Sequence, residues 1–180
     1  MSFARVRALV VIGVLAVAAV VFVIVALVRD SQHDAIANGC PAGSVLADIA
    51  LPDNPAEVTI KVFNGTTKVG LAEAVTSEFQ NRKFKTQKAT ENRKKFKGVA
   101  QLRYGPAAVG KAHLLKAYFL AQADPLYDPK RKGVVVDVVI GSQYQSLATS
   151  TEVNQSLVEL GEPELPPGAC LAPPKKAAKQ

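Results

Sequence analysis

The sequence predicts an α/β fold, here an α+β sandwich with the order β-α-β-β-α-β, in which two helices cover one face of a four-stranded sheet, preceded by one transmembrane helix. Three observations predict it. Apolar and polar residues alternate in four short segments. Apolar residues recur at helical spacing in two longer segments, and an unbroken apolar run of 21 residues lies near the N-terminus. Two strand–helix halves that share one sheet bury the apolar faces of both helices.

The apolar run, residues 8–28, contains no charge and no proline. At about 1.5 Å per residue it spans roughly 31 Å as a helix, close to the hydrocarbon thickness of a bilayer, whereas the apolar part of a secretory signal usually has about 7–15 residues. Residues 35–37 resemble a signal-peptidase site and residues 37–40 resemble a lipoprotein box, but both lie far beyond the run. A retained plasma-membrane anchor is therefore favoured over a cleaved signal.

Basic residues set the orientation of this anchor. Arg5 and Arg7 precede it, and Arg29 beside Asp30 follows it, so the positive-inside tendency keeps residues 1–7 in the cytoplasm and exports the rest. A short helix is expected in EVNQSLVEL, within a tail that is otherwise expected to be irregular. Composition divides the exported part into a stalk at residues 29–56, one domain at residues 57–145, and a polar, Pro-rich tail at residues 146–180.

The first half of the domain follows the order strand, helix, strand. Residues 58–62 alternate apolar and polar side chains, as in a half-buried strand. After a break at residues 64–66, apolar residues repeat at helical spacing from about residue 69. A weaker alternation over residues 84–90 predicts the second strand. The helical positions expected to face the core are Leu71, Ala74, Val75 and Phe79.

The second half repeats the same order. Residues 99–104 predict a strand, and a helix is expected over residues 106–123 because a proline suits its first turn. Asp124 and Asp128, each followed by proline, are interpreted as turn residues. Residues 134–140 have the clearest strand pattern of the chain.

The two cysteines, Cys40 and Cys170, both lie among glycine and proline, in loop composition. An even pair outside the cytoplasm predicts one disulfide. It would close a loop of about 130 residues and stabilise the fold by roughly 5 kcal/mol in the chain-entropy model. Two unrelated free thiols are the alternative. Neither histidine stands at ligand spacing to a cysteine, so no metal site is expected, and no cofactor is expected either.

The sequence contains no recognisable catalytic motif. His113 sits in the middle of a predicted helix without a nucleophile motif nearby. Asp137 alternates with core valines, which favours an exposed sheet face over a buried acid. Phosphate loops, metal-binding Glu–His motifs and dinucleotide fingerprints are missing from the sequence. We expect a protein that is not an enzyme, and a hydrolase or transferase that uses Asp124, Asp128 or His113 is the weaker alternative.

One turn in the sequence has the composition of a ligand site. In FNGTTKVGLA a strand ends, Gly65 permits a tight turn, and a helix begins with exposed amides that can bind an anion. Asn64, Thr66 and Thr67 add polar atoms. The alternative is that an asparagine or threonine side chain caps the helix.

A basic window is the second candidate site. Residues 82–97 contain eight basic residues and one acid, Glu91, for a net charge of +7, whereas residues 29–180 together carry +5. Charge gathered in this way attracts an anionic partner, and outside the cytoplasm an anionic cell-wall polymer or lipid headgroup is a better candidate than nucleic acid. The alternative is a solvated loop and edge strand whose lysines prevent edge pairing. The eight basic residues are Arg82, Lys83, Lys85, Lys88, Arg93, Lys94, Lys95 and Lys97.

Three stretches, VTIKVFNGTTKVGLAEAVTSEFQNRKF, LRYGPAAVGKAHLLKAYF and VDVVIGSQY, resemble the LytR C-terminal domain family. The family pattern is a strand ending in Asn-Gly, a Gly-Leu-Ala helix start, a strand opening on an aromatic, a strand ending near Tyr, and a last strand ending in Gly before an aromatic. The family's glycine before the first aromatic is Lys83 here. The matching positions, within residues 57–145, are Asn64, Gly65, Gly70, Leu71, Ala72, Phe84, Tyr104, Gly141 and Tyr144.

The resemblance implies a non-catalytic envelope protein outside the plasma membrane that supports cell-wall integrity, and the whole layout is similar to stand-alone, membrane-anchored envelope-integrity proteins of actinobacteria. In many relatives this domain follows a LytR-CpsA-Psr catalytic domain, which needs far more chain than residues 29–56 provide. The expected role is to bind anionic wall polymer, lipid or envelope partner proteins. A structural or assembly subunit of a glycopolymer transferase or another envelope complex is the alternative. No binding residue carries over from the family, because it has no agreed ligand site.

Overall fold

A computed structural model of the 180-residue chain describes residues 7, 12–13, 15–21 and 44–172. Residues 44–172 belong to one compact unit, and the N-terminal residues belong to another. In the N-terminal unit, residues 12–13 and 15–21 are helical with exposed side chains. Among the residues that the structure describes, none lies in a helix long and apolar enough to span a bilayer. Much of the predicted anchor, residues 8–28, lies outside the described residues, so the anchor stays a prediction.

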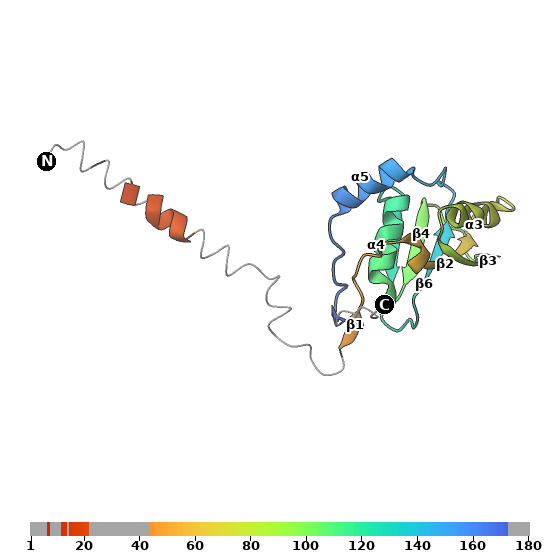
Figure 1. The fold of residues 1–180 in the computed structure, drawn as a ribbon, viewed down its shortest axis with the longest axis horizontal. Coiled ribbons are helices and arrows are strands. Elements are labelled where there is room, and N and C mark those ends of the chain that lie inside the picture. The colour runs from red at the N-terminus through yellow and green to blue at the C-terminus, as the bar shows by residue number, and fades with distance from the viewer. Residues whose placement is uncertain (1–6, 8–11, 14, 22–43, 173–180) are drawn as a thin grey trace, which may run out of the picture. The chain divides into compact units, whose positions relative to one another are not determined.

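A five-stranded mixed sheet forms the centre of the compact unit (Figure 1). Its spatial order is β3-β2-β6-β4-β5. Strand β2 runs parallel to both β3 and β6, β4 runs antiparallel to β6, and β5 runs parallel to β4. The mixed α/β class that the sequence predicts is therefore confirmed. The strands are β2 (Thr59–Asn64), β3 (Lys85–Glu91), β4 (Ala100–Tyr104), β5 (Ala123–Tyr127) and β6 (Val135–Ile140).

Edge strand β5 is the main difference from the predicted four-stranded sheet. The sequence pattern assigns ADPLY to a helix end and a turn, and this assignment is wrong. The second helix, α4 (Val109–Tyr118), stops earlier than expected, and Leu120 and Ala121 take positive φ values of 50° and 61°. These two residues redirect the chain into a strand beside β4. Pro125 is tolerated there because an edge strand leaves one side of its backbone without a ladder partner.

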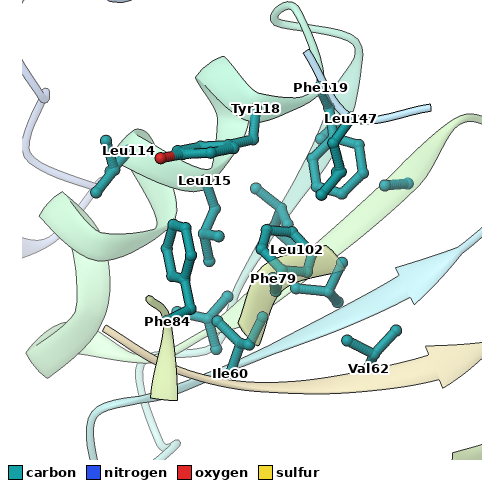
Figure 2. Close-up of a cluster of buried hydrophobic side chains, with 14 of the residues drawn as sticks. Ile60, Val62, Phe79, Phe84, Leu102, Leu114, Leu115, Tyr118, Phe119 and Leu147 are labelled. Atoms are coloured by element: carbon teal, nitrogen blue, oxygen red, sulfur yellow. The ribbon is translucent and has the colours of Figure 1, made fainter. Parts of the chain in front are cut away.

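Two helices, α3 (Leu71–Asn81) and α4, pack on one face of the sheet, as the periodicity predicts. The expectation that Ala74 faces the core is wrong, because Ala74 is exposed and Ala72 is buried instead. Their apolar side chains join those of β2, β4 and β6 in one core cluster (Figure 2). Phe79 is fully buried and meets Phe84 edge to face, with ring centroids 5.1 Å apart, and Phe84 meets Tyr118 in the same way at 5.0 Å. Each such pair stabilises the fold by about 0.5–1.5 kcal/mol beyond the burial of its area.

The predicted stalk and tail both contribute regular structure. Strand β1 (Val45–Ala47) pairs in parallel with β7 (Ala169–Leu171), and two short 3-10 turns, η1 (Pro55–Glu57) and η2 (Pro106–Ala108), precede β2 and α4. Helix α5 (Ser150–Leu160) lies where EVNQSLVEL predicts a short helix, and it packs on α4. The expectation of an irregular tail is wrong at β7, because this strand pairs with a segment more than 120 residues earlier in the chain.

The β1–β7 pair bears on the predicted disulfide. Cys40 lies outside the described residues. Cys170 is half-buried in β7, and its partner in β1 is Leu46, six residues after Cys40. The Cys40–Cys170 disulfide therefore stays a prediction.

Candidate functional site

The turn that follows β2 is closed by its own hydrogen bonds. The side-chain oxygen of the buried Asn64 accepts from the Thr66 backbone N–H at 3.0 Å and from the Thr66 hydroxyl at 2.8 Å. The Asn64 side-chain amide donates to the Lys68 carbonyl at 2.8 Å and to Glu91 Oε1 at 3.1 Å. An asparagine side chain offers two donor hydrogens and one acceptor oxygen with two lone pairs, so the capacity of Asn64 is used within the protein.

Neither Asn64 nor Thr66 caps α3, so the capping alternative does not hold. The helix begins after Gly70, which has a φ of 76° and contributes no side-chain cap. Gly65 permits close approach instead, because a Cβ there would lie 2.6 Å from the carbonyl oxygen of Ile140. Thr67 is exposed beside this turn. The anion site expected at residues 64–67 stays a prediction, and most of its polar atoms already serve the turn.

Two members of the basic window hold the fold together. The Arg82 guanidinium donates to the carbonyl oxygens of Ala148 and Leu147 and lies over the Tyr118 ring, 5.5 Å from its centroid. These contacts fasten the segment before α5 to the core. The Lys95 ammonium donates to the carbonyl oxygen of Thr66. Both side chains therefore have a structural role that their place in a charge run did not predict.

Edge strand β3 carries Lys85 and Lys88, both exposed. The register between β2 and β3 shifts between Lys61 and Phe63, which marks a bulge in this edge. Lysines and bulges are two of the devices by which natural sheets prevent edge-to-edge pairing. The solvated-edge interpretation of the basic window therefore suits these two lysines.

A groove of about 420 Å³ on the face of the sheet that the helices leave open gathers two more members of the basic window, whereas Lys83 and Lys97 are exposed and do not line it. Arg93 and Lys94, from the loop after β3, line one side, and Arg103 from β4 lines the other. Sequence analysis did not single out Arg103, because it lies outside the basic window. The alternation of buried Ala100 and Leu102 with half-buried Gln101 and Arg103 is the signal that places it on this face. The other lining residues are Phe63, Thr90, Glu91 and Asn92.

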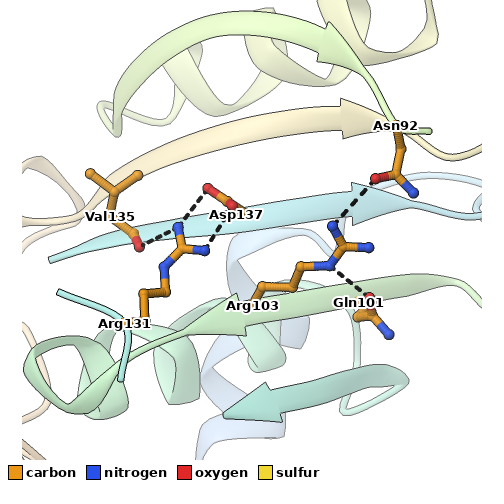
Figure 3. Close-up of polar contacts among 6 residues, drawn as sticks. All are labelled: Asn92, Gln101, Arg103, Arg131, Val135 and Asp137. Carbon is orange, nitrogen blue, oxygen red and sulfur yellow. Dashed lines mark hydrogen bonds and ion pairs between the residues drawn. The ribbon is translucent and has the colours of Figure 1, made fainter. Parts of the chain in front are cut away.

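Arg103 has an acid opposite it in the sheet and does not bind it. Its direct cross-strand partner in β6 is Asp137. The guanidinium instead donates from Nε to Gln101 Oε1 at 2.8 Å and from Nη1 to Asn92 Oδ1 at 3.3 Å (Figure 3). Asp137 pairs with Arg131, with N–O distances of 2.9 and 2.8 Å, and thus lies on the open face as the alternation predicts.

The groove lining carries three cationic side chains, those of Arg93, Lys94 and Arg103, against one carboxylate, that of Glu91. Lys61 lies beside it, with its ammonium 5.1 Å from the centroid of the Phe63 ring. Glu91 accepts from Asn64, and Asp137 is paired with Arg131. Within residues 44–172, Arg93, Lys94 and Arg103 form no ion pair with a carboxylate. A low-polarity surface that carries unneutralised cations attracts anions and concentrates them.

The candidate catalytic residues do not converge. His113 contacts the carbonyl oxygen of Gly161 through Nε2 at 2.9 Å, and Asp128 accepts from the Lys130 backbone N–H in a turn. Asp124 is exposed in β5. In the part of the chain that the structure describes, no three His, Cys, Asp or Glu side chains come together as metal ligands would.

Comparison with known families shows which family the domain matches. The family described as LytR cell envelope-related transcriptional attenuator matches residues 57–144. These residues are a LytR_C domain. The fold is similar to the crystal structure of the soluble domain of a conserved hypothetical secreted protein from Mycobacterium marinum, with a TM-score of 0.51 and 18% identity over 68% of this chain and 83% of that chain. The comparison with curated proteins gave no match.

The recurring residues of the LytR_C domain have physical reasons in this structure. A Cβ on Gly141 would lie 1.9 Å from the carbonyl oxygen of Gly98, so the end of β6 has no room for a side chain. Lys83, which replaces the family's glycine, keeps a left-handed φ of 70°, a conformation that glycine adopts most easily. The turn before β3 therefore keeps the glycine-like backbone despite the substitution.

Proposed function

We propose that this protein is a non-catalytic, membrane-anchored envelope protein whose exported LytR_C domain binds an anionic cell-wall polymer. One observation carries the proposal: Arg93, Lys94 and Arg103 surround a single groove and form no ion pair with a carboxylate within residues 44–172. Surface cations that serve stability are usually paired or spread over a face, whereas a binding site gathers them without neutralising them.

Two findings support a position in the envelope. The matching family is described as related to the cell envelope, and the solved protein with a similar fold is described as secreted. An anionic lipid headgroup and an acidic envelope protein are the competing partners, and a wall polymer is favoured because the groove is open along a sheet face. A polymer can lie across such a face with successive charges in contact.

The proposal is tested by neutralising the groove and measuring retention on purified cell wall. The full chain, solubilised in detergent, is incubated with wall material stripped of membrane and then sedimented. The variant Arg93→Gln/Lys94→Gln should lose most of the bound fraction, and rising salt should weaken wild-type binding because exposed charges are screened. The matched control is Lys130→Gln/Lys132→Gln, which removes the same charge from exposed positions before the opposite end of β6.

The control should bind as the wild type does. Equal losses in both variants would indicate a general charge effect without a site, and equal binding by all three proteins would rule out the groove as the wall-binding surface. Binding to vesicles of anionic lipid but not to stripped wall would favour the headgroup over the polymer.

A further inference from the structure

The groove also contains the elements of a more specific recognition site. Resting on the proposed function, we infer that Arg103 binds one anionic group, a phosphate or a carboxylate, that is attached to a sugar ring, and that the sugar packs against Phe63. Arg93 and Lys94 then supply the surrounding field. The inference assigns a ligand class and two contact residues to the groove.

On this face of the sheet, Asp137 pairs with Arg131 and not with Arg103. Opposite charges that stand directly across two strands normally pair, and Arg103 stands directly across from Asp137. Arg131 reaches Asp137 from outside the sheet and binds both of its carboxylate oxygens, at 2.9 and 2.8 Å. Arg103 is thus left without its cross-strand acid and turns toward the groove (Figure 3).

The way in which Arg103 is held is the second step. Gln101 and Asn92 accept from its Nε and Nη1, and both acceptors are neutral amide oxygens. They orient the guanidinium without neutralising it, and Nη2 has no partner among the described residues. A half-buried charge is costly unless it is hydrogen-bonded or paired, and an arginine fork fits the planar or tetrahedral oxygens of carboxylate and phosphate.

The apolar part of the groove is the third step. Phe63 is half-buried on β2 and lines the same groove as Arg103. An aromatic ring beside a charged group suits a ligand that has a C–H face on one side and an anion on the other, and a sugar bearing phosphate or carboxylate has both. A free anion has no C–H face to pack on Phe63, and a neutral sugar offers Arg103 only hydroxyl acceptors, which form weaker hydrogen bonds than an anion does.

The inference is tested with four soluble probes and the detergent-solubilised full chain. Glucose 6-phosphate, glucuronate, inorganic phosphate and glucose are titrated by ligand-observed NMR. We expect the two anionic sugars to bind more tightly than phosphate or glucose alone, and the tighter of the two identifies the anion. Arg103→Gln should weaken their binding by about tenfold or more, the size expected for the loss of a charged hydrogen bond. Phe63→Leu should weaken anionic sugars but leave inorganic phosphate unchanged.

A pair of second variants separates recognition from folding. Arg131→Gln frees Asp137 to pair with Arg103 and should therefore weaken binding although Arg131 does not line the groove. Adding Asp137→Asn to that variant removes the competing acid and should restore binding. Because Asp137→Asn also removes an unpaired carboxylate, urea unfolding of both variants is measured beside binding. Recovery of binding without a matching recovery of stability supports the inference, and binding that only follows stability indicates a structural role for Arg131.

The results also distinguish this inference from the proposed function. The inference would be overturned if the Arg103→Gln variant bound both anionic sugars as tightly as the wild type does. It would also be overturned if glucose bound the wild type as tightly as the anionic sugars do. If Arg93→Gln/Lys94→Gln still lost wall binding in that case, the proposed function would stand. Wild-type protein that neither sediments with wall nor binds any probe would overturn both.

Discussion

Replacing Gly141 with alanine should destabilise the domain strongly, although the change adds a single methyl group. The new Cβ would lie 1.9 Å from the Gly98 carbonyl oxygen and 2.6 Å from Cδ1 of Phe96, whereas real contacts of this kind stay at or above 3.0 Å. Relief requires a separation of about 1.1 Å, the difference between 3.0 and 1.9 Å. The Phe96 ring can move by side-chain rotation, but the closer group is the Gly98 backbone, so rotation alone does not relieve the clash.

The cost follows from what that separation breaks. Gly141 donates to the Val99 carbonyl oxygen at 2.9 Å, and Ser142 donates to the Phe96 carbonyl oxygen at 3.0 Å. Overpacking costs about 1–3 kcal/mol, and two weakened hydrogen bonds cost about 0.5–1.5 kcal/mol each. We expect a loss of about 3 kcal/mol or more in the free energy of unfolding, which corresponds to roughly 10 °C in Tm for a domain of this size.

Urea unfolding followed by far-UV circular dichroism measures this loss, and Gly70→Ala is the matched control. Gly70 has open space around its Cβ position and a φ of 76°, so alanine there meets only the left-handed penalty of about 1–2 kcal/mol. Gly141→Ala should therefore be the more damaging of the two. A smaller loss for Gly141→Ala than for Gly70→Ala would refute the steric reasoning.

Three further predictions concern capping and pH. Thr149→Ala should cost about 1 kcal/mol of unfolding free energy by removing the cap of α5. Hydrogen bonds from the Thr149 backbone and hydroxyl lower the pKa of Glu152. The stability that this pair contributes is therefore present above the ordinary carboxyl pKa and is lost as the pH falls through the lowered pKa. Glu152→Gln should flatten this acid dependence, measured as urea unfolding midpoints at a series of pH values. Burial, then the nearby Glu78, raises the pKa of Tyr144, so stability is complete below the ordinary phenol pKa and is lost as pH rises toward the raised value. Tyr144→Phe should unfold less steeply in alkali, and equal slopes for both proteins would contradict this assignment.

The elements that the sequence predicts correctly share a local cause. The alternation in residues 58–62 and the spacing of apolar residues in α3 follow from the geometry of a strand and a helix, which each segment expresses by itself. The elements that it misses depend on distant partners. Strand β5 has an unfavourable composition and exists because β4 offers it an edge, and β7 exists because β1 lies beside it.

The candidate site shows the same division. The basic window is visible in the sequence as a charge count, but the structure separates its members, so Arg82 fastens the tail, Lys88 protects an edge, and Arg93 and Lys94 line the groove. Arg103 escapes a search for charge runs because its neighbours in the groove come from other strands.

The sequence by itself determined the periodic elements, the net positive charge of one region and the resemblance to the LytR C-terminal family, because each is a property of consecutive residues. Only the tertiary structure decided which charges meet. Strand register puts Arg103 opposite Asp137, and the approach of Arg131 then leaves Arg103 to the groove. The register between Arg103 and Asp137 joins segments 34 residues apart, which no local pattern encodes.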